Sequence, residues 1–410
     1  MKNNLARIFH ESPAATTDMA VLPGVLGCRT LRRTAQVRLG TNTLRLPGGT
    51  TIFAVSRQQF IKYPGEHDDL ANIRTPLMIL ENECGLVNKP AKIELKLSLS
   101  AYLLSFLLLP CILITFFAVP AFAIRLIKVK LVFELKGEFN KPTDVSVSKD
   151  GFIYVVDGVN NKIKIFNKKG RFLSSFGRQG SGRSEFKLPL GIDIDNGGRV
   201  YIADSGNQRV QILESKGGFI KEIRLPRQND HPADPTDVVV DNLNNRCYIV
   251  DNDNHQVLAY DLFTLKLIKT YGSHGAGKDR FRYPFFAALG KEQNLYVVDV
   301  INTRVQVLSS EGLFVAEIGG WGVEKGEFFR PKGVAVDKND RVYVSDSYVG
   351  VIQVFEATGE FYAALGDPNT GKVKKFRTPM GLFMDRENRL YVVETLANKV
   401  SVYQLQGVTE

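Results

Sequence analysis

Short apolar runs alternate with clusters of Asn, Gly, Ser and Lys along most of this chain. Four such runs follow one another between residues 191 and 223: GIDID, RVYIAD, RVQIL and GFIKEI. Short runs rich in β-branched and aromatic side chains and bounded by turn-forming residues are typical of β-strands. The pattern therefore predicts a domain built from short strands.

A tyrosine followed three residues later by a carboxylate recurs six times, at spacings of 47, 47, 48, 47 and 48 residues. A period of this length with four strands per unit is typical of a propeller blade, because one unit cannot bury its apolar faces alone. We therefore expect an all-β fold, a six-bladed β-propeller of four-stranded blades. The repeated pairs are Tyr154 and Asp157, Tyr201 and Asp204, Tyr248 and Asp251, Tyr296 and Asp299, Tyr343 and Asp346, and Tyr391 and Glu394.

The repeated residues are best explained by structural roles. The tyrosine strands show no polar alternation, so both of their faces are expected to be covered. We expect the tyrosines in the core with their hydroxyls reaching a partner, and the carboxylates to accept backbone N–H groups of the following turn. The third strands alternate, as in Val305-Gln306-Val307, and are expected to be partly solvated.

The joints between units carry a Phe-x-x-Pro motif, in which each proline marks the start of a first strand because it cannot donate to a strand ladder. The joint into the third unit keeps only Pro235. The motif is found at Phe139 and Pro142, Phe186 and Pro189, Phe281 and Pro284, Phe328 and Pro331, and Phe376 and Pro379.

The sixth unit ends after three strands, which would leave an unpaired edge. Residues 129–137, ahead of the first Phe-x-x-Pro motif, align with the fourth strands of other units, such as residues 170–177. We therefore expect strand 129–135 to complete the sixth blade and close the propeller.

The units resemble NHL repeats. Residues 331–337 (PKGVAVD) are similar to the first part of the NHL pattern and residues 302–308 (NTRVQVL) to the last. The resemblance covers about residues 129–404. It implies the fold and says little about function, because propellers host many unrelated sites. Enzymes of similar build include streptogramin lyases, lactonases and amidating lyases; the amidating type needs three histidines around the channel, and the equivalent strands here carry none.

An uncharged segment, residues 101–123, precedes the propeller and is long enough to span a bilayer. Lysines ahead of it and an Ala-Phe-Ala end suit either a cleaved signal peptide or a transmembrane anchor. We expect three regions: a poorly structured leader at 1–86, the signal or anchor segment at 87–123, and the propeller at 124–410. Both alternatives place the propeller in the cell envelope, periplasmic or extracellular, and translation is expected to start near Met78 or at Val87.

Cysteine content and charge exclude several classes of protein. The four cysteines do not form a disulfide framework, and Cys247 is expected to be a small core residue. The net charge of +10 raises the question of nucleic acid binding. Basic residues recur five positions after the blade carboxylates, but Gln256 and Val351 interrupt the ring, so no nucleic acid partner is expected. The basic residues are Lys162, Arg209, Arg304 and Lys399.

Positions where the repeat changes are the better candidates for a site. Two residues after the joint proline, three blades have glycine, whereas the others carry Asp144, Asp237 and Phe286. These first strands should line the central channel. Asp144 and Asp237, with Thr143 and Thr236, are candidates for binding a polar ligand or a divalent metal at the channel mouth.

The third blade and its joints hold three histidines, His231, His255 and His274, which are an alternative set of ligands for zinc or another transition metal. Residues 272–278 (GSHGAGK) have the spacing of a phosphate-binding loop, but Asp279 stands where Ser or Thr should hold magnesium. This segment is therefore expected to be an ordinary joint.

The sequence favours a non-enzymatic binding scaffold with no cofactor, whose partner is a protein or a small polar ligand of the cell envelope. Its contact surface is expected on the face with the joint loops, including Trp321, His274 and the channel mouth. The membrane is a further partner if residues 101–123 are retained. The alternative is a metal-dependent lyase or hydrolase, lactonase-like, acting at the channel mouth.

Overall fold

The computed structural model describes residues 43–45, 51–53, 124–228 and 231–409. The chain divides into two compact units, Met1–Val119 and Pro120–Glu410. In the first, β1 (Thr43–Arg45) pairs with β2 (Thr51–Phe53). The expected signal or transmembrane segment lies outside the described residues. Within the described part of the chain, no helix has the length and apolar character needed to cross a bilayer.

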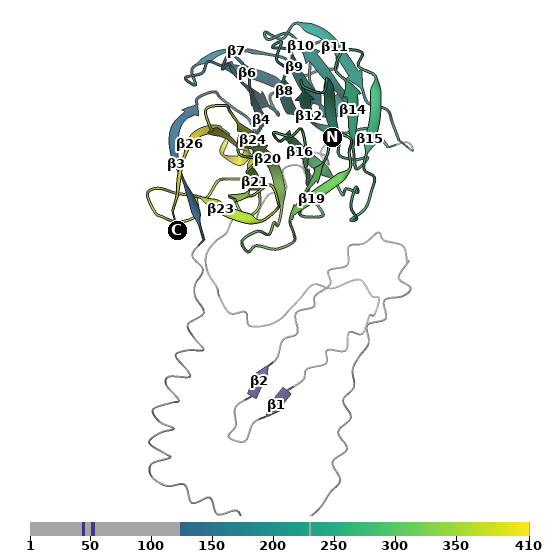
Figure 1. The fold of residues 1–410 in the computed structure, drawn as a ribbon. Helices are drawn as coiled ribbons and strands as arrows, with labels where there is room; N and C mark the ends of the chain where they lie inside the picture. Colours follow the sequence, from purple (N-terminus) through teal and green to yellow (C-terminus); the bar gives the residue numbers. More distant parts are fainter. Residues whose placement is uncertain (1–42, 46–50, 54–123, 229–230, 410) are drawn as a thin grey trace, which may run out of the picture. The chain divides into compact units, whose positions relative to one another are not determined.

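The second unit consists of six groups of four strands around a centre (Figure 1). The first strands contact one another in a closed ring, which confirms the expected propeller of four-stranded blades. The first five blades are β4 (Pro142–Val147), β5 (Ile153–Asp157), β6 (Lys162–Phe166) and β7 (Phe172–Phe176); β8 (Pro189–Ile194), β9 (Val200–Asp204), β10 (Arg209–Leu213) and β11 (Phe219–Arg224); β12 (Pro235–Asp241), β13 (Arg246–Asp251), β14 (Gln256–Asp261) and β15 (Leu267–Tyr271); β16 (Pro284–Leu289), β17 (Leu295–Asp299), β18 (Arg304–Leu308) and β19 (Phe314–Gly319); and β20 (Pro331–Val336), β21 (Val342–Asp346), β22 (Val351–Phe355) and β23 (Phe361–Gly366).

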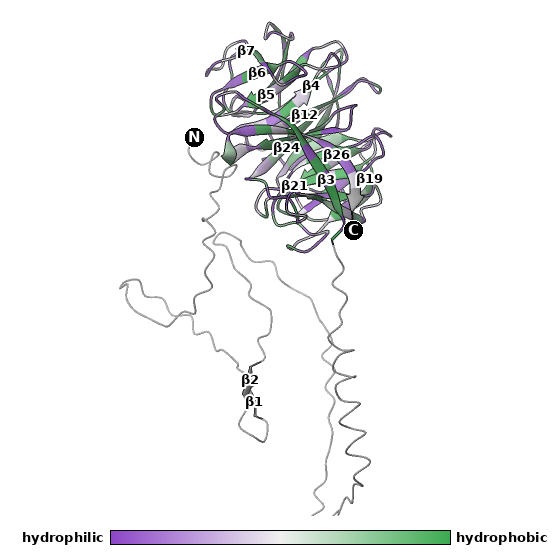
Figure 2. Cartoon of the chain, turned by 90° about the vertical axis from the view of Figure 1, so that its left-hand side faces the viewer, coloured by the Kyte–Doolittle hydropathy of each residue, from purple (hydrophilic) through white to green (hydrophobic). Residues whose placement is uncertain are grey.

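The sixth blade combines both ends of the propeller. It contains β24 (Pro379–Met384), β25 (Arg389–Glu394), β26 (Lys399–Thr409) and β3 (Leu126–Leu135). Strand β3 lies antiparallel to β26 (Figure 2), with Leu135 opposite Val400 and Val129 opposite Leu405, so the expected pairing of residues 129–135 is confirmed. The strand also begins earlier than expected: Leu126–Lys128 pairs in parallel with the end of β23 in the fifth blade.

All six first strands begin at the joint proline, as expected. Each proline lies opposite the carboxylate that ends the second strand, as Pro331 lies opposite Asp346. Joints and second-to-third-strand loops therefore emerge at the same end of the propeller, which we call the joint-loop face. The joint phenylalanines pack between neighbouring blades. The ring of Phe281 lies so close to Gly272, where φ is +85°, that a Cβ atom at Gly272 would be 2.5 Å from it.

The second strands are buried, as expected, apart from the half-buried arginines that begin β13 and β25. The expectation that the third strands are partly solvated is wrong. Gln211 is fully buried, and its Nε2 donates to the Glu185 carbonyl at 2.7 Å. The polar side chain of this alternating strand therefore bonds to the backbone of the joint rather than to water. The fourth strand carries the exposed positions instead, as β7 shows, because it is the outermost strand of its blade.

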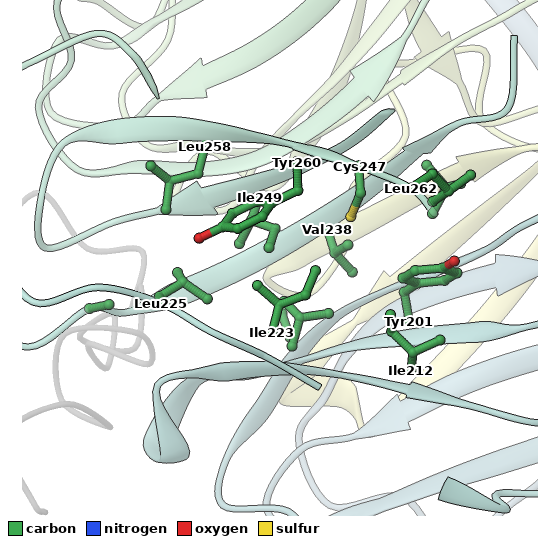
Figure 3. Close-up of a cluster of buried hydrophobic side chains, with 14 residues drawn as sticks. Tyr201, Ile212, Ile223, Leu225, Val238, Cys247, Ile249, Leu258, Tyr260 and Leu262 are labelled. Carbon is green, nitrogen blue, oxygen red and sulfur yellow. The ribbon is translucent and has the colours of Figure 1, made fainter. Parts of the chain in front are cut away.

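Apolar side chains from neighbouring blades interlock to form the core. Figure 3 shows one such cluster, with Cys247 pointing toward Val238, Ile223 and Tyr201 between the second and third blades. The Cys247 thiol is free and buried, and burial raises its pKa, so it is an unreactive core residue as expected.

Candidate functional site

A cavity of about 210 Å³ lies in the central channel and is lined by residues from all six first strands. Three carboxylates, Asp144, Asp193 and Asp237, and the ring of Phe286 contribute to its wall. The structure thus brings together three of the residues that the sequence suggested for a channel site and adds Asp193.

Asp144 and Asp237 each join two neighbouring blades. An Asp144 carboxylate oxygen accepts the backbone N–H of Ile192 in the next blade at 3.0 Å, and Asp237 does the same with Ala287 at 2.8 Å. Both are at least 94% buried, at 6% and 4% exposure. Their carboxylates are therefore part of the contacts that hold the first strands together.

The glycines at the equivalent positions leave space for these carboxylates. A Cβ atom at Gly381 would lie 2.4 Å from Oδ1 of Asp144, and one at Gly191 would lie 2.4 Å from Oδ1 of Asp237. The change between Gly and Asp along the repeat therefore has a packing cause: an Asp in one blade needs a Gly in the blade before it.

Asp193 was not among the sequence candidates. It stands two residues after Gly191 and accepts hydrogen bonds from the Ser146 hydroxyl at 3.2 Å and from the Val240 backbone N–H at 2.8 Å. The signal that could have identified it is its place in the repeat. It is the one carboxylate at a position that other blades fill with Ser, Val, Ala or Phe.

Burial dominates the electrostatics of the cavity. It raises the pKa of Asp144 to about 8 and the pKa of Asp193 to about 6, although backbone N–H groups pull both values down. The pKa of Asp237 is raised well above its usual range by burial and by the charge of Asp144. The cavity therefore retains protons at neutral pH.

The remaining channel candidates are packed into the wall. The hydroxyls of Thr143 and Thr236 each donate to the carbonyl of the next blade at 2.7 Å, to Leu190 and Phe285 respectively. Phe286 is buried against Phe285, with ring centroids 4.8 Å apart.

The structure brings two of the three candidate histidines into contact. The rings of His255 and His274 have centroids 4.7 Å apart. Nδ1 of His255 accepts the backbone N–H of Tyr283 at 3.1 Å, which places the proton of the neutral ring on Nε2. Burial lowers the pKa of His255 to about 4, with smaller contributions from His274, Arg282 and His231.

The position of His255 in the repeat explains that hydrogen bond. Asn161 occupies the same place in the first blade and accepts the N–H of Leu188 through its side-chain oxygen at 2.8 Å. Both residues have positive φ, 53° and 56°, a conformation that Asn and His adopt more readily than most residues. His255 thus performs the structural task of an asparagine.

The repeated carboxylates have a structural role, but with a partner other than the expected one. Asp204 accepts the backbone N–H of Lys187 at 2.7 Å, in the joint 17 residues upstream, and the other blades repeat this bond. The expected bonds to the following turn occur at Asp346, which accepts from Tyr348 and Val349. The carboxylate fixes the joint because the proline that follows starts directly opposite it.

Two of the basic residues near these carboxylates, Arg209 and Arg304, form ion pairs inside the blades. Arg209, 2% exposed, contacts Asp204 at 2.9 Å and Glu222 at 2.8 Å, and Arg304 makes the same pair of contacts with Asp299 and Glu317. Lys162, at the equivalent place in the first blade, is exposed. The buried arginines are therefore internal ion pairs.

Most of the repeated tyrosines have a hydroxyl partner, as expected. Tyr201, Tyr343 and Tyr391 donate to carboxylates six residues upstream, at 3.1–3.3 Å. Tyr154 donates to the Ser215 carbonyl, whereas the buried hydroxyl of Tyr248 has no hydrogen-bond partner in the described structure.

Neither candidate set forms a metal centre as it stands. Across residues 124–228 and 231–409, no three His, Cys, Asp or Glu side chains are grouped so that they could hold a metal ion. The channel carboxylates accept backbone N–H groups, and His255 uses one ring nitrogen in the same way.

Comparison with known proteins agrees with this architecture. Residues 136–234 match a family described as a 6-bladed beta-propeller, and residues 328–355 match the NHL repeat. No curated protein sequence matches the chain.

Solved structures share the fold at low identity. A streptogramin B lyase is 16% identical, with a TM-score of 0.50 over 68% of this chain and 97% of that one. A gluconolactonase from Xanthomonas campestris is 14% identical, with a TM-score of 0.52 over 70% and 93%. A protein of unknown function from Bacteroides thetaiotaomicron is 13% identical, with a TM-score of 0.51 over 69% and 76%. The chain is therefore a six-bladed β-propeller, and residues 328–355 within it match the NHL repeat.

Proposed function

We propose that this protein is a binding scaffold of the cell envelope and that its joint-loop face holds the partner. The observation that carries this proposal is a set of exposed apolar side chains on the fourth and fifth blades of that face. Trp321 is 76% exposed, Val323 64% and Tyr348 50%. Trp321 and Val323 lie in the joint before β20, and Tyr348 lies in the loop after β21.

Contacts within the joint and with the neighbouring loop hold these side chains in place. The ring of Tyr348 stacks on Phe329, with centroids 4.3 Å apart. The joint is fixed by the Asp346 carboxylate, which accepts the N–H groups of Phe329 and Arg330, and by a short parallel bridge between Trp321 and Phe328. Exposed aromatic side chains on a rigid base are typical of protein contact sites, because little entropy is lost when they are covered.

The envelope location rests on the sequence of residues 101–123, whether the segment is a signal peptide or an anchor. A protein partner fits the joint-loop face better than a small ligand, because these side chains project outward rather than lining a hollow. Phosphatase fusions at the C-terminus, which are active only outside the cytoplasm, test the location.

Site-specific photo-crosslinking tests the binding surface. A photoreactive residue at Trp321 is compared with one at Leu243, which is 75% exposed but lies in the loop between β12 and β13, at the opposite end of the propeller. We expect a discrete crosslinked partner from position 321 that is lost with Tyr348→Ala. Equal products from both positions, or none from position 321, would contradict the proposal.

The tryptophan also offers a direct readout. The chain contains one Trp, and it is on this surface. Partner binding should therefore shift the fluorescence emission of Trp321 to shorter wavelength. If a partner identified by crosslinking saturates the protein and the emission does not change, the contact lies elsewhere.

The enzymatic alternative, a metal-dependent lyase or hydrolase at the channel mouth, gains no support from the lyase and gluconolactonase similarities beyond the fold. Elemental analysis of the purified protein, before and after Asp144→Ala and Asp237→Ala, tests it. A stoichiometric metal that is lost in these variants would favour the enzyme over the scaffold.

A further inference from the structure

Three blades repeat one ion pair between the cation that begins their third strand and a Glu of their fourth strand. The first blade has Lys162 at the start of β6, but it has Ser175 where the other three have the Glu. Ser175 lies opposite the third residue of β6, which is the register that Glu222 has with β10. The three pairs are Arg209 and Glu222 at 2.8 Å, Arg304 and Glu317 at 2.8 Å, and Lys399 and Glu134 at 2.7 Å.

The buried carboxylate of the first blade is neutralised by a different residue. Lys164 is 8% exposed; its Nζ lies 2.8 Å from the Asp157 carboxylate and donates to the Glu138 carbonyl at 2.7 Å. In the second blade, the glutamine at the Lys164 position makes the same two kinds of contact, and the arginine at the Lys162 position pairs with the blade carboxylate. Lys162 is thus released from both of the internal acids that hold its counterpart.

The joint ahead of the first blade is also shorter than the others. Phe139 follows Gly137 by two positions, whereas Phe186 follows Gly177 by nine. In the second blade, the longer joint covers the arginine, whose Nη2 donates to two joint carbonyls at 2.7 and 3.0 Å. The short joint has no residues to place there, so the corresponding space in the first blade is open.

A pocket of about 530 Å³ occupies this space at the joint-loop end of the first blade. Because Lys164 is paired with Asp157, Lys136 and Lys162 supply positive charge in excess of the exposed carboxylate of Glu138. Besides these residues, the lining includes Asn160, Phe172 and Ser175.

We propose that this pocket binds the carboxylate of an external ligand, which pairs with Lys162 as a fourth-strand Glu does with its cation in three other blades. An isolated exposed ion pair contributes little, but here Lys136 and the Ser175 hydroxyl add further donors around one charge. The pocket is larger than one carboxylate, so it has room for the carbon chain of the ligand beside Phe172. The ligand is an organic acid or the acidic side chain of a peptide. This inference does not depend on the proposed contact surface of the fourth and fifth blades.

The test measures protection of Lys162 against an amine-acetylating reagent in the folded full-length chain, read by peptide mass spectrometry. Glutarate is the small-acid probe and a capped glycine peptide with a central Glu is the peptide probe, each compared with chloride at equal ionic strength because salt screens such contacts. A bound carboxylate covers the amine and favours its protonated, unreactive form, so we expect labelling of Lys162 to slow by about threefold or more. Lys168, an exposed lysine of the same blade, is the internal reference and should not change.

Protection by glutarate alone would identify the ligand as a small organic acid, and protection by the peptide would identify it as an acidic side chain. Absence of protection by both probes overturns the proposal.

A pair of variants in β7 makes the result specific to the pocket. Ser175→Glu supplies the internal partner found in the other blades, so it should slow Lys162 labelling by itself and abolish further protection by either probe. Ser174→Glu adds the same charge on the opposite face of the strand and should leave the protection intact. Both serines are exposed, so both variants should fold. Protection that persists in Ser175→Glu, or that is lost equally in Ser174→Glu, contradicts a carboxylate site at Lys162.

Discussion

Nδ1 of His255 accepts the backbone N–H of Tyr283, as the side-chain oxygen of Asn161 does for Leu188 two blades earlier. A residue that looked like a metal ligand in the sequence thus connects a second-to-third-strand loop to the joint that follows its blade. Substitution of His255 can distinguish a role as a metal ligand from a role as the acceptor of this hydrogen bond.

His255→Asn should fold with nearly unchanged stability at pH 7.5, because Asn supplies the same acceptor and tolerates the positive φ. His255→Leu leaves the Tyr283 N–H without its partner and should cost about 1–3 kcal/mol. Urea unfolding measures both variants. Equal losses in the two would show that the histidine ring has a task beyond accepting this bond.

The same histidine should make the protein sensitive to acid. Its folded pKa of about 4 lies below its ordinary value, so the unfolded chain binds more protons between about pH 4 and 6.5. Stability from this residue is complete above pH 6.5 and is lost as the pH falls toward 4. Thermal unfolding across this window should therefore show a weaker acid dependence in His255→Asn than in the native chain.

The channel carboxylates should have the opposite pH dependence. The folded pKa of Asp144, about 8, is higher than that of an unfolded Asp, so the folded chain binds more protons between about pH 4 and 8 and becomes less stable as the pH rises. Asp144→Asn keeps an acceptor for the Ile192 N–H and removes the buried charge. We expect it to stabilise the protein at pH 8.5 by several kcal/mol, with little effect at pH 4. Destabilisation at pH 8.5 would mean that the charge itself is needed there, as in a cation site.

Close packing of the first strands predicts a strong effect from one methyl group. In Gly191→Ala, the new Cβ would meet Oδ1 of Asp237 at 2.4 Å and its Cα at 2.7 Å. Overpacking of this kind typically costs about 1–3 kcal/mol, and the backbone contact places this site at the upper end. Gly320→Ala is the matched control, because no atom lies within 4 Å of its Cβ position. Comparable midpoints of chemical denaturation for the two variants would argue against the tight contact.

The internal ion pairs predict unequal effects at equivalent repeat positions. Arg209→Ala leaves Asp204 buried without its cation and should cost about 3–5 kcal/mol. Lys162→Ala, at the same position but exposed, should change stability by less than about 0.5 kcal/mol. Denaturant unfolding distinguishes them, and a small effect at Arg209 would show that Glu222 and water compensate.

The sequence predicted the repeat architecture because blade period, joint prolines and strand patterns are local signals. The sequence also predicted the closing strand. The sixth unit lacks a fourth strand, and residues 129–135 ahead of the first unit have the pattern of one. The prediction was wrong about Gln211, Gln306 and Gln353 of the third strands, because alternation cannot distinguish water from a joint carbonyl as the partner. Asp193 was missed for a related reason: its significance depends on the contacts that its carboxylate makes with the two neighbouring blades.

Strand β3 gives the propeller one further property. Leu126 and Thr409, near the two ends of the domain, are cross-strand partners. The propeller is therefore a closed ring of blades whose two chain ends lie side by side. The packing of the blades does not require the ends to be at this position. A short linker from Thr409 to Leu126 should permit new termini to be opened at other joints, so that circular permutants retain the same six blades.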